Sequence, residues 1–190
     1  MRKKWGMRHE SKPMGRLLAT AFHEAGHALA DYRLDLGVKR VRIVQIGDSA
    51  GSASSTVRMD FAALQHETPN RKLLAFWHDV VISRLAGREA QRRFKPHSVR
   101  SYQSRDDMEG VNNILCQLHP ENEQGAVYQY LKIRTRNLIG QKTNWRMIQD
   151  LAHVLIEKRL LRGDEVFAIF RASLKRQQSD FAGFGSVSCL

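Results

Sequence analysis

The stretch LLATAFHEAGHALA, residues 17–30, decides how the chain is interpreted. Apolar residues recur in it at steps of three and four, which is the spacing of one face of an α-helix. We predict a helix over residues 16–34, with Gly37 as the residue that stops it. Within this helix His23 and His27 are four residues apart, so both side chains lie on the same face.

The segment His23-Glu24-Ala25-Gly26-His27 is an HExxH motif. Two imidazoles at this spacing on a helix can bind one Zn²⁺, and the adjacent Glu24 is placed to take the proton of an attacking water. Glycine inside a helix costs about 1 kcal/mol relative to alanine, so Gly26 indicates a close approach of a second backbone or of a ligand. The motif therefore predicts metal-assisted hydrolysis of peptide bonds. A chance match on an ordinary solvated helix face is the alternative.

A catalytic zinc ion needs a third protein ligand and one open position. The longer HExxHxxGxxH pattern is absent, which argues against the metzincin arrangement. Residue type alone leaves eleven candidates open for the third ligand: His66, Glu67, His78, Asp79, Glu89, His97, Asp106, Asp107, Glu109, His119 and His153.

The remaining pattern predicts a mainly α fold of the α+β type. Two β-rich segments, 38–46 and 53–59, flank the turn sequence GDSAGS, and broken alternation in the first indicates a bulge or a strand partly buried on both faces. A long helix is expected to start at Thr68 and Pro69 and to end near Phe94. Further helices are expected at 104–118, 121–138, 144–160 and 164–175.

The length and composition indicate the number of domains and the kind of binding partner. The chain has 190 residues, of which 42% are hydrophobic, so it forms one ordinary domain. We expect a basic N-terminal arm at 1–15, the folded domain at 16–176 and a flexible C-terminal tail at 177–190. Lys and Arg number 31 against 19 Asp and Glu, and the net charge of +12 favours an anionic partner, either nucleic acid, an acidic protein or a membrane surface.

Several classes of protein are excluded. Two cysteines are too few for a disulfide framework and fit a reducing compartment, so we expect a cytoplasmic protein. No apolar run is long enough for a membrane span or a signal peptide, and the GxxxxGK[ST] phosphate loop of ATPases is missing.

HEAGHALA followed by the strand-like VKRVRIVQI resembles the peptidase domain of the FtsH family of ATP-dependent zinc proteases. Three further segments occur in the order of that family. RLAGREAQ is similar to its GGRAAEE segment, SRDDMEGVNNIL to its SNDLERAT segment, and LIEKRLLRGDEV to its last helix pair. They lie at 84–91, 104–115 and 155–166, so the resemblance spans about residues 17–172.

The resemblance implies a helical metallopeptidase domain with a small β-sheet beside the cleft. It makes His23 and His27 zinc ligands, Glu24 the general base and Asp107 the third ligand. Asp106 is an alternative third ligand, because the Asp-Asp pair permits a shift of one residue. The strand at 41–46 is expected, again by resemblance, to pair with an extended substrate.

The chain departs from the family in lacking its transmembrane segments and ATPase module. We therefore predict a zinc endopeptidase that cleaves flexible polypeptides, alone or served by a separate ATPase, and homo-oligomers are compatible with the resemblance. One alternative is a regulatory protease that cuts one partner protein at one site. Another is a basic module that binds nucleic acid or an acidic protein and has a non-catalytic metal site. In the protease, nucleic-acid binding would be accessory.

Overall fold

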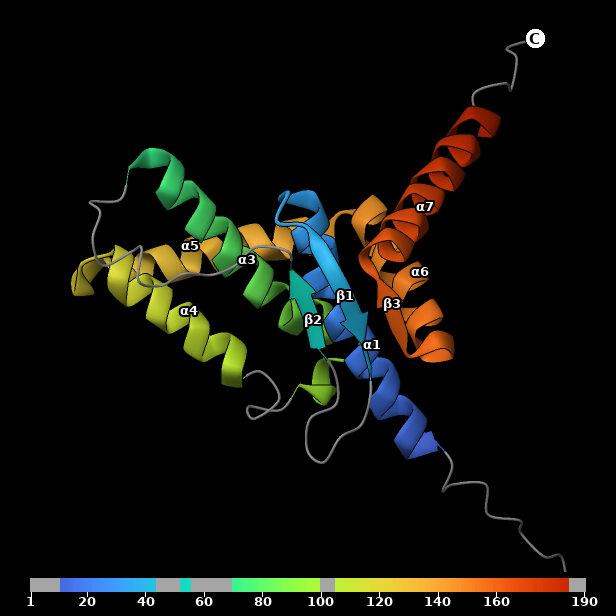
Figure 1. Cartoon of the computed structure of the whole chain (residues 1–190), viewed down its shortest axis with the longest axis horizontal. Coiled ribbons are helices and arrows are strands. Elements are labelled where there is room, and N and C mark those ends of the chain that lie inside the picture. The colour runs from blue at the N-terminus through green and yellow to red at the C-terminus, as the bar shows by residue number, and fades with distance from the viewer. Residues whose placement is uncertain (1–10, 44–51, 56–69, 100–104, 185–190) are drawn as a thin grey trace, which may run out of the picture.

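The protein is mainly helical with one small antiparallel sheet, as predicted (Figure 1). The computed structural model describes residues 11–43, 52–55, 70–99 and 105–184. Its elements are, in chain order, α1 (Ser11–Arg33), β1 (Val38–Arg42), β2 (Ser52–Ser55), α3 (Arg71–Phe94), the short 3₁₀ turn η1 (Pro96–Ser98), α4 (Arg105–Leu118), α5 (Glu121–Gly140), α6 (Lys142–Lys158), β3 (Leu160–Arg162) and α7 (Gly163–Phe184). No helix in these ranges is long and apolar enough to cross a membrane.

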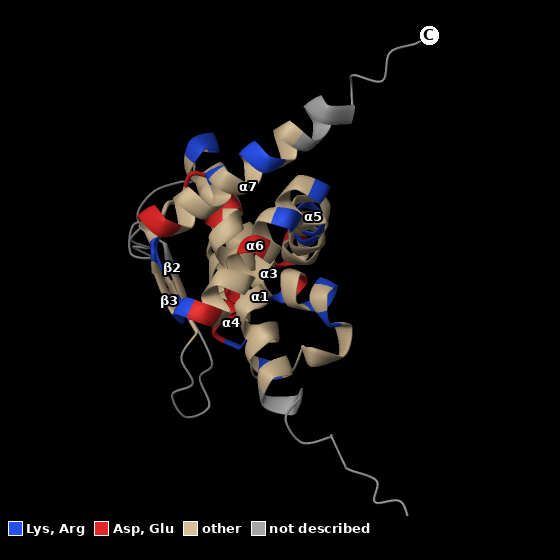
Figure 2. Cartoon of the chain, turned by 90° about the vertical axis from the view of Figure 1, so that its right-hand side faces the viewer, with Lys and Arg blue, Asp and Glu red and all other residues tan. Residues whose placement is uncertain are grey.

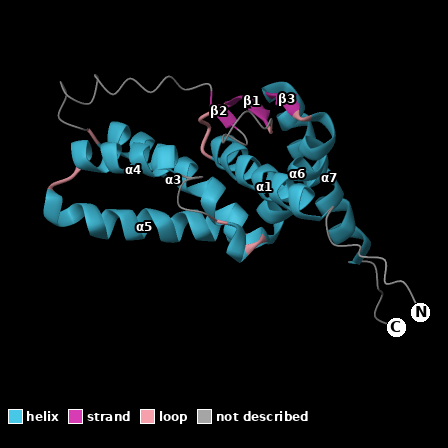
Figure 3. Ribbon diagram, turned by 90° about the horizontal axis from the view of Figure 1, so that it is seen from below, coloured by secondary structure: helices cyan, strands magenta, loops and turns pink. Residues whose placement is uncertain are grey.

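Helix α1 lies at the centre of the fold. Figure 3 shows the strands over α1, with α6 and α7 on one side of it and α3, α4 and α5 on the other. One apolar cluster joins α1 to the sheet, α6 and α7, and it includes Phe22, Val41 and Phe170. A second cluster joins α3, α4 and α5, and it includes Trp77 and Ile114. The helices α1 and α3 pack against each other where the two clusters meet.

The sheet has the strand order β2-β1-β3, so β1 is its central strand. The register shifts between Val38 and Arg40, which places a bulge at Lys39; residues 44–46, where the sequence suggested one, lie outside the described residues. Both edges of β1 are occupied, by β2 and by β3. The expectation that this strand pairs with a substrate is therefore wrong for the part that the structure describes. The outer edge of β2, like that of β3, is free of any other described strand.

Strand β3 was not predicted, because it has only three residues and follows directly on a helix. Helix α6 ends at Lys158, since Arg159 adopts a left-handed backbone conformation with φ of 65°. The chain then enters β3 and turns into α7 at Gly163. A Cβ atom at this position would lie 1.9 Å from the Val38 carbonyl oxygen, so only glycine fits against β1 there.

Several element ends differ from the sequence-based expectations, among them both ends of α6, expected at 144–160 and found at Lys142–Lys158. Helix α1 begins at Ser11, so the expected arm at 1–15 ends in helix; Pro13 is tolerated there because a first-turn N–H has no helical partner. Helix α3 begins at Arg71 and is capped by Asn70, whose side chain accepts the backbone N–H groups of Lys72 and Leu73; the expected start at Thr68 and Pro69 lies outside the described residues.

Helix α7 continues to Phe184, so much of the expected tail at 177–190 is helical. The reason lies in its contact with α6. Gln177 is buried, and its side-chain amide donates to the Thr143 carbonyl and to the Ser173 hydroxyl.

Candidate metal centre

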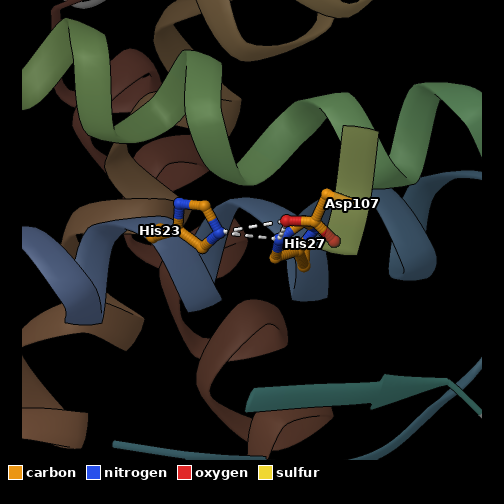
Figure 4. Close-up of side chains that lie close together, drawn as sticks. All are labelled: His23, His27 and Asp107. Carbon is orange, nitrogen blue, oxygen red and sulfur yellow. Dashed lines mark hydrogen bonds and ion pairs between the residues drawn. The ribbon is translucent and has the colours of Figure 1, made fainter. Parts of the chain in front are cut away.

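Three side chains from two helices converge on one point (Figure 4). His23 and His27 come from α1, and Asp107 comes from the first turn of α4. The two Nε2 atoms are 3.1 Å apart, and the Asp107 Oδ2 atom lies 3.4 Å from that of His23 and 3.3 Å from that of His27. Ligands at tetrahedral positions about 2.0–2.1 Å from a zinc ion are about 3.3–3.4 Å from one another. The three atoms thus have the spacing of three ligands of one zinc ion.

The orientation of the two rings agrees with this spacing. The centroids of His23 and His27 are 4.8 Å apart and the ring planes are inclined by 73°, so the rings converge on a common point at an angle. A second histidine pair, His78 and His119, is different. Its Nε2 atoms are 3.0 Å apart, but its centroids are 5.2 Å apart and its rings are inclined by only 21°. That pair meets nearly head-on, as in one N–H···N hydrogen bond.

Helix α3 fixes the orientation of both histidines. The His27 Nδ1 atom lies 2.8 Å from the Ser83 carbonyl oxygen, and the His23 Nδ1 atom lies 3.0 Å from the Gln91 side-chain oxygen. The Gln91 amide nitrogen donates to the Ser98 carbonyl oxygen at 3.1 Å, so its oxygen must face His23. Both acceptors place the proton on Nδ1 and leave each Nε2 lone pair directed at the convergence point. The donor set therefore fits a metal ion.

Two glycines make room for this arrangement. At Gly26 a Cβ atom would lie 2.7 Å from the Ala86 carbonyl oxygen, so this glycine lets α1 and α3 approach each other closely. The close backbone approach predicted from the sequence is confirmed. At Gly87 on α3 a Cβ atom would lie 2.3 Å from the His27 Nε2 atom and 2.8 Å from that of His23. Any side chain at Gly87 would thus occupy the place of the two ligand atoms.

Glu24 lies beside the convergence point and is 5% exposed. Burial raises the pKa of its carboxyl group, although His23 and His27 act in the opposite direction. The backbone N–H of Ala53, in β2, donates to the carboxylate. The Oε2 atom is buried and has no hydrogen-bond partner among the described residues. An unpartnered buried carboxylate oxygen next to a candidate metal site can accept a proton there.

The backbone of β1 shows which side of β2 faces Glu24. The Ile43 N–H donates to the Arg159 carbonyl, so Ile43 and, two residues away, Val41 point their backbone groups toward β3. Arg40 and Arg42 then point theirs toward β2 and bond to Ser54 and Ser52. The intervening Ala53 points its N–H and C=O away from β1. Glu24 consequently lies at the outer edge of β2, the free edge on this side of the sheet within the described residues.

In the protein without metal, the side chains of His27 and Asp107 stabilise each other's charged forms. Burial alone would lower the pKa of His27, but the Asp107 carboxylate outweighs burial and raises it to about 10. Burial would raise the pKa of Asp107, yet both histidines hold it well below its usual range. This cluster of side chains therefore stabilises a positive charge next to a carboxylate, as a cation site does.

The structure separates the candidates that the sequence left open. Among the described residues, the only cluster of three or more His, Cys, Asp or Glu able to hold a metal is His23, His27 and Asp107. Asp106 is exposed on the neighbouring face of α4 and is not part of it. Glu89 forms ion pairs with Arg92 and Arg136 instead. His66 and Glu67 lie outside the described residues. The remaining candidates are described and are not part of the cluster: His78, Asp79, His97, Glu109, His119 and His153.

Comparison with known proteins adds no family to this geometry. No protein-family model and no curated protein sequence matches the chain. The resemblance to the FtsH family therefore stays a prediction, and the functional argument depends on the site itself.

The contact between Gln91 and His23 gives a first test. Replacing Gln91 with leucine removes the acceptor for the His23 Nδ1–H, and zinc affinity is expected to fall about tenfold to hundredfold. Competition with a chromogenic zinc chelator measures this change. The exposed Gln129 on α5 is the matched control, and Gln129→Leu should leave the affinity unchanged. Equal affinities for both variants would contradict the role given to Gln91.

Proposed function

We propose that the protein is a zinc-dependent endopeptidase, similar in its site to the peptidase domain of the FtsH family. The observation that carries the proposal is the triangle of His23, His27 and Asp107 ligand atoms, with 3.1–3.4 Å sides. The buried Glu24 beside it supports the peptidase reading, because a purely structural zinc site has four protein ligands and needs no base. Three protein ligands leave a position open for water and substrate.

Each residue of the site has a separate role in the proposed reaction. His23, His27 and Asp107 would hold the zinc ion, and Ser83 and Gln91 keep the two imidazoles in the ligating tautomer. Bound zinc would supply a Lewis acid that polarises the scissile carbonyl and makes water acidic enough to attack near neutral pH. Glu24 accepts the proton of the attacking water on Oε2 and later returns it to the leaving amine. The Ala53 N–H keeps the Glu24 carboxylate in place.

The free edge of β2 is the candidate binding site for the polypeptide substrate. An extended chain added there would donate a backbone N–H to the outward Ala53 carbonyl oxygen, directly beside Glu24, which holds the Ala53 N–H. Such main-chain pairing gives affinity with little dependence on sequence. In this proposal β2 takes the place that the resemblance assigned to the strand at 41–46.

Metal dependence tests the proposal directly. The purified protein is expected to bind one zinc ion per chain, to cleave an unfolded substrate such as casein, and to lose the activity on chelation and regain it with zinc. Metal analysis and gel-based cleavage measure both quantities on the same sample. Asp107→Asn should lose zinc and activity, whereas Asp106→Asn, its exposed neighbour, should keep both. Cleavage that survives chelation, or stoichiometric zinc without any cleavage, would contradict the proposal.

A further inference from the structure

The sheet has one apolar face and one basic face. Val41, Ala53 and Leu161 are paired neighbours on the face toward α1, and Val41 and Leu161 are fully buried. The residues before and after Val41, Arg40 and Arg42, lie on the opposite face. Figure 2 shows Lys and Arg on the strands as well as on α5 and α7, so the positive charge is not confined to the helices.

The arginines on this basic face differ in their partners. Arg162, on β3, forms a two-fold contact with Asp164, through Nε at 3.2 Å and Nη2 at 3.0 Å. Neither Arg40 nor Arg42 has a carboxylate partner within the described ranges. Among the described residues, the positive charge of Arg40 and Arg42 on β1 therefore has no carboxylate paired with it.

Arg42 extends this charge to the free edge. Its Nε atom donates to the Ser52 hydroxyl oxygen at 3.0 Å, and Ser52 is its partner across β1 and β2. The guanidinium group thus lies over β2, with its terminal nitrogens beyond Nε. A planar guanidinium held in this way presents paired donors that match a carboxylate.

We propose that Arg42 selects acidic side chains in the polypeptide that adds to the free edge of β2. This inference rests on the proposed peptidase function. The substrate residue opposite Ala53 donates its N–H to the outward Ala53 carbonyl oxygen, while the Ala53 N–H stays with Glu24. Its side chain points toward α1, as that of Ala53 does. The next substrate residue, opposite Ser52, points its side chain to the basic face. There it meets the guanidinium of Arg42, so Asp or Glu is favoured at that position.

An extended acidic peptide fits this surface better than a nucleic acid. The free edge offers backbone donors and acceptors in the pattern that another strand uses. Single-stranded nucleic acids are generally bound by aromatic side chains on which bases stack. The three strands contain no aromatic residue at all.

Matched peptides test the selection. Three quenched fluorescent peptides share an extended apolar sequence and carry Glu, Gln or Lys at every second position. The zinc-loaded wild-type protein is expected to cleave the Glu peptide with a KM about threefold to tenfold below that of the Gln peptide, in the range for exposed to partly buried charged contacts. The Lys peptide should be the poorest substrate. Added salt should narrow the difference, because the pair is partly exposed.

Variants on the basic face identify the residue. Arg42→Gln should remove the preference for Glu over Gln, and Arg42→Glu should reverse it in favour of Lys. Arg162→Gln is the matched control, since Arg162 lies on the same face but is paired with Asp164 and separated from the free edge by β1. Equal cleavage of all three peptides by the wild type, or an unchanged preference in Arg42→Gln, would overturn the selection and leave the peptidase function standing.

A binding measurement separates this inference from the proposed function. Labelled Glu, Gln and Lys peptides are titrated with zinc-loaded Glu24→Gln protein, and fluorescence anisotropy gives the dissociation constants. The same order of affinities, lost in the double variant with Arg42→Gln, supports the inference even if no peptide is cleaved. Equal affinities overturn it. Binding of a labelled single-stranded oligonucleotide that depends on Arg42, without discrimination among the peptides, would also overturn it and favour a nucleic-acid surface.

Discussion

Replacing Glu24 with glutamine is expected to lower kcat/KM for an unfolded protein substrate by about 10²–10⁴, the contribution typical of a general base. Zinc should stay bound at one ion per chain, because Glu24 is not part of the ligand triangle. Glutamine has the shape of glutamate and can still accept the Ala53 N–H, but it cannot take a proton at the position of Oε2. Burial raises the pKa of Glu24, so the carboxylate is a stronger base than an exposed glutamate.

The measurement combines metal analysis with cleavage of casein by the same preparation. Glu157 on α6 is exposed and distant from the cluster, so Glu157→Gln serves as the control and should retain full activity. Wild-type activity in Glu24→Gln would remove Glu24 from the mechanism. Loss of zinc together with activity would show that the side chain supports the site and does not act as the base.

Replacing Gly87 with alanine is expected to weaken zinc binding strongly. Removal of a ligand's hydrogen-bond partner lowers metal affinity about tenfold to hundredfold, and the loss in Gly87→Ala should be larger. The new Cβ atom would lie 2.3 Å from the His27 Nε2 atom, so the imidazole must swing away from the convergence point. That movement would break the contact of its Nδ1 atom with Ser83. A retreat of α3 from α1 would give up the close contact of Ala86 and Ala90 with Gly26.

Calorimetric titration with zinc measures this loss, and circular dichroism shows whether the helices remain. Gly125 on α5 is the matched control, since a Cβ atom there would meet nothing within 4 Å. Gly125→Ala should keep zinc affinity and gain up to about 1 kcal/mol of stability from the better helix propensity of alanine. Zinc affinity of Gly87→Ala equal to that of the wild type would show that the ion does not bind where the two Nε2 atoms converge.

The central helix and the histidine pair of the site could be predicted because both depend on residue spacing within one segment. Helical periodicity and the four-residue step between His23 and His27 are properties of one segment. The cost of Gly26 in a helix pointed correctly to a second backbone close by. These features need no knowledge of the rest of the fold.

The choice of Asp107 over Asp106 as the third ligand depends on the tertiary structure. Both residues are in the first turn of α4, where any acidic residue is stabilised by the helix dipole. Only the rotation of α4 about its axis, set by the packing of Val111 and Ile114 on α3 and α5, decides which carboxylate faces the histidines. Sequence spacing alone does not encode that rotation.

The supporting residues on α3 left a signal that was not used. Ser83, Gly87 and Gln91 are four residues apart in turn and form a small, polar stripe on a helix whose other buried residues are apolar except Glu89. Such a stripe on a core helix indicates a polar feature opposite it, here the two histidines. Strand β3 left no signal, because it forms only where the free side of β1 can receive it.

Pairing of β1 with strands from both sides also sets an order of events during synthesis. Helix α1, β1 and β2 leave the ribosome first, while β3 and the helices on either side of it are still to be made. Until β3 arrives, β1 exposes a second row of unpaired backbone groups, and such a row can pair with other nascent chains. The late arrival of three residues, Leu160–Arg162, closes this row, so the interval before it is when the chain most needs protection from aggregation.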